Sequence, residues 1–117
     1  MYNISVIPHK KQRYPTVGDW VLDGDDIKIT VSDTGDWRMN ALVGVHELVE
    51  VLLCKDRKIP QSIVDKFDID HPELSDPGEH PNAPYQREHN FATKIEKLLC
   101  AEFGIKWKDY EKILINL

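Results

Sequence analysis

The feature that most constrains the fold is an almost wholly apolar segment with three ionisable side chains at its centre. The segment runs from Ala41 to Cys54, and apart from the terminal thiol its only ionisable groups are those of His46, Glu47 and Glu50. At about 100° per residue these three side chains fall on one arc of an α-helix. A helix that is apolar nearly all round is buried, so the segment predicts a core helix whose polar groups need buried partners.

A second long helix, predicted from Tyr85 to Phe103, supplies candidate partners. His89 and Glu96 stand seven residues apart and lie on one edge of its apolar face. Both side chains are therefore expected to point partly inward. Two buried helices that each carry His and Glu on a core-facing edge are expected to face each other.

A bound metal ion would satisfy these groups. Zinc prefers imidazole and carboxylate ligands, and an i,i+4 pair on a helix directs two side chains at one point. The predicted ligands are His46, Glu50 and His89, with the fourth position left for water. Glu47 is placed as the general base of a metal-water hydrolase, and Glu96 as the group that orients His89 through its other ring nitrogen.

These residues follow a predicted hairpin, and that order resembles the zincin metalloproteases. The zincin helix carries His-Glu-x-x-His, whereas this chain has His46-Glu-Leu-Val-Glu50. Glu50 stands where the motif has its second histidine, and His89 on another helix would restore the two-His, one-Glu ligand set of the Glu-type zincins. The resemblance implies hydrolysis of a peptide or of another small carbonyl compound.

Three blocks of the chain, at 7–20, 42–54 and 83–93, are similar to an uncharacterised family of small bacteriophage and prophage proteins. This similarity spans most of the chain. It implies a phage origin and brings no activity with it.

An interpretation without metal stays open. His46 would then be a hydrogen-bonded core histidine, while Glu47 and Glu50 would meet lysines at the surface. The protein would be a non-catalytic phage accessory protein that binds a host or phage protein, and the polar notch between the two helices would be closed and structural.

The rest of the chain predicts an α+β fold. β-rich runs predict strands at 2–7, 20–22 and 27–31, and an Asp-Gly pair joins the last two as a hairpin. Shorter helices are predicted at 61–68 and 107–114. Segment 71–84 has four prolines and is predicted to be a long irregular loop. The expected architecture is one domain, residues 1–117, with a small antiparallel sheet of two or three strands packed on two long and two short helices.

The charge and hydropathy of the chain limit the classes of partner that it is expected to bind. A net charge of -5 argues against nucleic-acid binding, since a phosphate backbone requires a basic surface. No apolar run approaches the ~18 residues of a membrane span, and the start lacks the pattern of a signal peptide, so the expected location is the cytoplasm of the bacterial host. Cys54 and Cys100 both fall in predicted helices, which favours reduced core thiols over disulfides.

Overall fold

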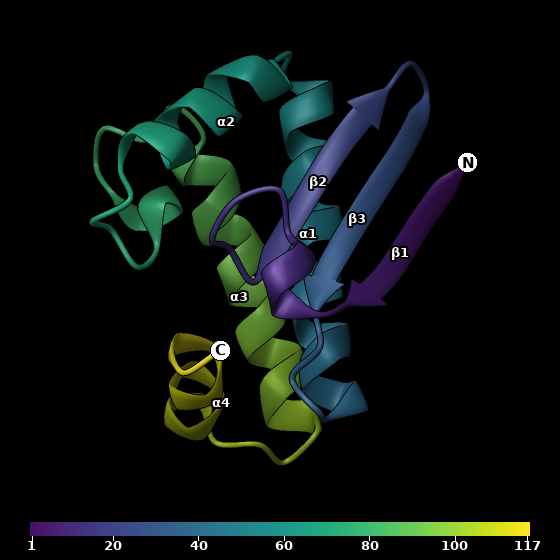
Figure 1. Cartoon of the computed structure of the whole chain (residues 1–117), viewed down its shortest axis with the longest axis vertical. Coiled ribbons are helices and arrows are strands. Elements are labelled where there is room, and N and C mark those ends of the chain that lie inside the picture. Colours follow the sequence, from purple (N-terminus) through teal and green to yellow (C-terminus); the bar gives the residue numbers. More distant parts are fainter.

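A computed structural model describes all of residues 1–117, and its elements confirm the α+β class (Figure 1). One sheet contains the three strands, which are β1 (Tyr2–Ile7), β2 (Gly18–Asp23) and β3 (Asp26–Ser32). The two long helices are α1 (Trp37–Asp56) and α3 (Gln86–Glu102), and the two shorter ones are α2 (Gln61–Asp70) and α4 (Trp107–Ile115). Two 3₁₀ turns complete the fold, η1 (His9–Lys11) and η2 (Pro77–Glu79).

The sheet is mixed, which corrects the expected antiparallel one. β2 and β3 form the predicted hairpin, and Gly24 takes a φ of 61° at its turn, which suits glycine. β1 lies on the far side of β3 and runs parallel to it, with Ile4 beside Ile29. The segment after β1 reverses the chain, so β1 is antiparallel to β2 and therefore parallel to the strand between them.

The core lies between the sheet and α1, and continues between α1 and α3. In Figure 1, α1 passes behind the sheet, α3 lies beside α1, and α4 returns along the C-terminal half of α3. Asp36 caps α1 by accepting a hydrogen bond from the backbone N–H of Arg38 (2.9 Å). Cys54 and Cys100 are free and buried in this core, as predicted. None of the helices combines the length and the apolar character needed to span a membrane.

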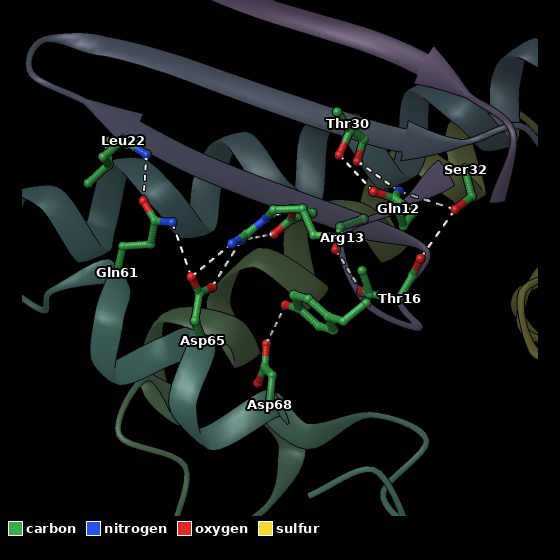
Figure 2. A network of polar contacts seen from close by, with 12 residues as sticks. Gln12, Arg13, Thr16, Leu22, Thr30, Ser32, Gln61, Asp65 and Asp68 are labelled. Carbon is green, nitrogen blue, oxygen red and sulfur yellow. Dashed lines mark hydrogen bonds and ion pairs between the residues drawn. The ribbon is translucent and has the colours of Figure 1, made fainter. Parts of the chain in front are cut away.

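The segment between β1 and β2 ties the sheet to α2 (Figure 2). The Gln12 side chain accepts a hydrogen bond from the Thr30 hydroxyl (2.8 Å) and donates one to the Thr30 carbonyl (3.3 Å). Arg13 donates to both carboxylate oxygens of Asp19 (2.7 and 2.8 Å) and reaches Asp65 of α2 (3.1 Å). Because α2 borders the cavity described below, this network fixes one of the cavity walls.

We expect Arg13→Ala to lower the free energy of unfolding by about 1.5–3 kcal/mol, because it leaves the buried Asp19 carboxylate without its charged partner. Urea unfolding measures the loss. Arg38→Ala is the matched control: its ion pair with Asp36 is open to solvent, so its loss should change the free energy of unfolding much less than the loss of Arg13. Equal small losses in the two variants would contradict a structural role for Arg13.

Candidate metal centre

The three predicted ligands converge on one point between α1 and α3. Nε2 of His46 lies 3.2 Å from Oε2 of Glu50 and 3.2 Å from Nδ1 of His89. Nδ1 of His89 lies 2.9 Å from the same Glu50 oxygen. All three side chains are buried, and the group could hold a metal ion.

The outer nitrogen of His46 is held by Glu96. Nδ1 of His46 donates to Oε1 of Glu96 (2.8 Å), and the hydroxyl of Tyr110 on α4 donates to the other Glu96 oxygen. Glu96 therefore orients His46, which corrects the prediction that it would orient His89. His89 and Glu96 are two turns apart on α3, about 10 Å along its axis, which is too far for their side chains to meet. Glu96 instead meets His46 of α1.

The remaining two ligands are also anchored, by residues that sequence reasoning missed. Nε2 of His89 donates to Oδ1 of Asp76 (3.1 Å), in the loop before η2. Oε1 of Glu50 accepts from the indole N–H of Trp20 on β2 (3.0 Å). Asp76 stands in an irregular loop where no periodicity gives its direction. Trp20 had a usable signal, because a buried tryptophan needs an acceptor for its N–H.

These contacts decide which atoms face the centre. Nδ1 of His46 and Nε2 of His89 carry the ring protons, because each donates to a carboxylate on the outer side. In the neutral rings, the other two nitrogens, Nε2 of His46 and Nδ1 of His89, therefore direct lone pairs at each other and at Glu50. Three electron-pair donors at such distances repel unless positive charge lies between them. In the chain alone, that charge can come only from protons.

The pKa values reflect this demand for positive charge. Burial lowers the pKa of His89, but hydrogen bonds with Asp76 and Glu50 outweigh it and raise that pKa to about 10. His46 follows the same pattern: burial lowers its pKa, and bonds with Glu50 and Glu96 hold it well above its usual value. Burial raises the pKa of Glu50, yet its two histidine contacts bring it down to about 2.

The spacing of the donor atoms fits a tetrahedral metal ion. With metal–ligand bonds of about 2.0 Å, neighbouring ligand atoms around such an ion lie roughly 3.3 Å apart. The three observed separations are 3.2, 3.2 and 2.9 Å. Each ligand also has the outer hydrogen bond that metal-binding histidines and carboxylates usually make.

Two glycines allow backbone to approach the site closely. A Cβ atom at Gly78 in η2 would lie 2.4 Å from two ring atoms of His89, so the loop lies directly against that ligand. A Cβ atom at Gly18 in β2 would lie 2.6 Å from Oε1 of Glu47. Neither glycine has a positive φ, so both are required for space and not for backbone conformation.

Glu47 lies beside the ligands and is not one of them. Its side chain is partly buried and borders the same cavity, and its carboxylate has no hydrogen-bond partner in the chain. Burial and the neighbouring charge of Glu50 hold the pKa of Glu47 well above its usual range. Neither glutamate pairs with a lysine, contrary to what the interpretation without metal expects. The structure thus leaves one free carboxylate next to the three convergent donors.

The sequence-predicted residues therefore lie together at one place, with His46, Glu50 and His89 at the centre, Glu47 beside them and Glu96 behind one ligand. Comparisons with protein-family models, with curated proteins and with solved structures find no match to this chain. Its function is accordingly inferred from its own residues.

Proposed function

We propose that this protein binds one zinc ion through His46, Glu50 and His89 and hydrolyses a peptide or another small carbonyl compound. The observation that carries the proposal is the convergence of three anchored donor atoms at the spacing of a tetrahedral ion. Hydrogen bonds alone would also place these atoms about 3 Å apart. The ion is favoured because both inner ring nitrogens and the Glu50 oxygen face one point, while the outer atoms of all three side chains already have partners.

The donor set favours zinc. Two imidazoles and one carboxylate suit Zn²⁺, and three protein ligands with one open position are typical of catalytic zinc sites. The site also borders a cavity of about 580 Å³, so a substrate can reach it. A closed structural zinc site would have four protein ligands.

Within this proposal, Glu47 is the general base. A zinc ion held by His46, Glu50 and His89 would supply a Lewis acid at this edge of the cavity. Glu47 would take a proton from the attacking water and pass it to the leaving amine, which balances the hydrolysis. Its carboxylate has no hydrogen-bond partner in the chain and borders the cavity, so it is free to accept a proton and return it.

We further propose that the protein is of bacteriophage or prophage origin and acts in the bacterial cytoplasm. Support comes from the similarity of three sequence blocks to small phage proteins. The zincin-like order of hairpin and His-Glu helix supports the hydrolase in the same way.

Elemental analysis of protein purified without chelator tests the metal proposal. We expect close to one zinc per chain, and a lower melting temperature after chelation, because an ion bound only by the folded state stabilises it. Protein that is metal-free as purified, takes up no zinc and melts unchanged with chelator would overturn the proposal. It would favour the non-catalytic accessory protein with a structural notch.

A further inference from the structure

The cavity above the candidate centre has a one-sided charge. Its lining residues come from the segment before β2, from β2, α1, α2 and α3, from the loop around η2, and from α4. They include nine of the chain's 20 Asp and Glu residues and none of its 15 Lys and Arg residues. Four histidines and a divalent ion would offset only part of that charge.

Two basic side chains beside the cavity, those of Arg13 and Lys97, are already engaged with residues of its wall. Arg13 pairs with Asp19 and Asp65, and Lys97 lies over the ring of Trp107 with its Nζ 5.2 Å from the ring centre. Neither basic residue lines the cavity. Of the nine lining carboxylates, four therefore have no ion pair with a basic group of the chain, and these are Glu47, Asp68, Glu79 and Glu111.

The three exposed carboxylates of the lining form an acidic rim, which we define as Asp76, Glu79 and Glu111, and of these Asp76 alone is paired, with His89. Asp76 and Glu79 come from the loop around η2, and Glu111 comes from α4, so two separate elements present them. All three are exposed, and no ion pair in the structure joins Glu79 or Glu111 to a basic residue. Burial and the charges of Asp76 and Glu111 raise the pKa of Glu79, in agreement with their proximity.

Apolar side chains also line the cavity, on the same two elements as the rim. Leu74, Trp107 and Leu114 line the cavity near the rim. Lysine and arginine combine a charged head with an apolar stem, so such a wall suits them better than it suits a small inorganic cation. The size of the cavity also exceeds what a metal ion alone would need.

We propose that the cavity selects a basic peptide, with lysine or arginine side chains placed against the acidic rim. This inference rests on the proposed function, and it names the substrate class of the same site. Acidic peptides should bind more weakly, because their charges would repel the carboxylates of the cavity.

The test uses zinc-loaded protein of measured zinc content and two capped hexapeptides with the same apolar residues, one carrying two lysines and the other two glutamates. We expect the lysine peptide to bind at least ten-fold more tightly by calorimetry, with a preference that shrinks as salt is added. Equal binding, tighter binding of the glutamate peptide, or no binding of either would overturn the inference. Zinc that stays bound in those cases leaves the metal proposal standing.

Variants connect that preference to the rim. The double variant Glu79→Gln/Glu111→Gln should lose most of the discrimination while keeping its zinc, because neither residue contacts a ligand. Glu73→Gln is the matched control: it removes a charge from the same loop but does not line the cavity, so the preference should persist. An unchanged preference in the double variant would overturn the role of the rim. Spermidine that binds as tightly as the lysine peptide would point to a polyamine and overturn the peptide assignment.

Discussion

His89→Ala is expected to abolish zinc binding. The substitution removes one of three donor atoms, and it is the only donor that α3 contributes. Zinc titration by calorimetry should show a loss well beyond the roughly 10- to 100-fold that follows removal of an outer partner. Asp76→Asn should fall within that smaller range, because it weakens the acceptor behind Nε2 of His89 and leaves the donor in place.

His80→Ala is the control for this series. It removes a histidine from the neighbouring loop whose ring lies toward Phe67 and His71 and not toward the metal centre. Its zinc stoichiometry should be unchanged. Circular dichroism of His89→Ala separates a lost ligand from a lost fold. A folded His89→Ala protein with full zinc affinity would show that the ligand set is wrong.

Glu47→Gln is expected to keep zinc and to lose turnover by roughly 10²–10⁴-fold, the usual contribution of a general base. The amide has nearly the same shape as the carboxylate, so it should fit against Gly18 as Glu47 does, but it cannot accept the proton. Turnover of the lysine hexapeptide, followed by mass spectrometry, and the zinc content of the same preparation measure the two effects. A variant that cleaves the peptide at the wild-type rate would remove Glu47 from the mechanism, and a variant that loses its zinc would make Glu47 a ligand.

Local pattern was sufficient for most elements of the fold. The run around His46 predicted α1 because its side chains are almost all apolar, as in a buried helix. The Asp-Gly pair predicted the β2–β3 hairpin because the turn needs a glycine. The parallel pairing of β1 could not be predicted in this way. The pairing of β1 with β3 depends on how the segment between Pro8 and Val17 reverses the chain. No residue pattern within β1 indicates that path.

The candidate site, like the fold, was predicted from local sequence pattern only in part. Helical periodicity placed His46, Glu50 and His89 on facing surfaces, and the structure brings them together. Periodicity gives the face of a helix but not the height at which two helices meet, so Glu96 was assigned to the wrong histidine. Asp76 lies in an irregular loop, where neither face nor height can be derived from sequence.

The proposed ligands come from two distant parts of the chain, so a bound ion would affect the stability of the fold. Glu50 and His89 are 39 residues apart in sequence, and the chain contains no disulfide, since both cysteines are free. An ion bound between α1 and α3 would cross-link the chain through metal coordination and close the segment from Glu50 to His89 into a ring. Disulfides close comparable rings in small secreted domains. A reducing compartment would leave the metal cross-link intact, whereas a chelator would cut it.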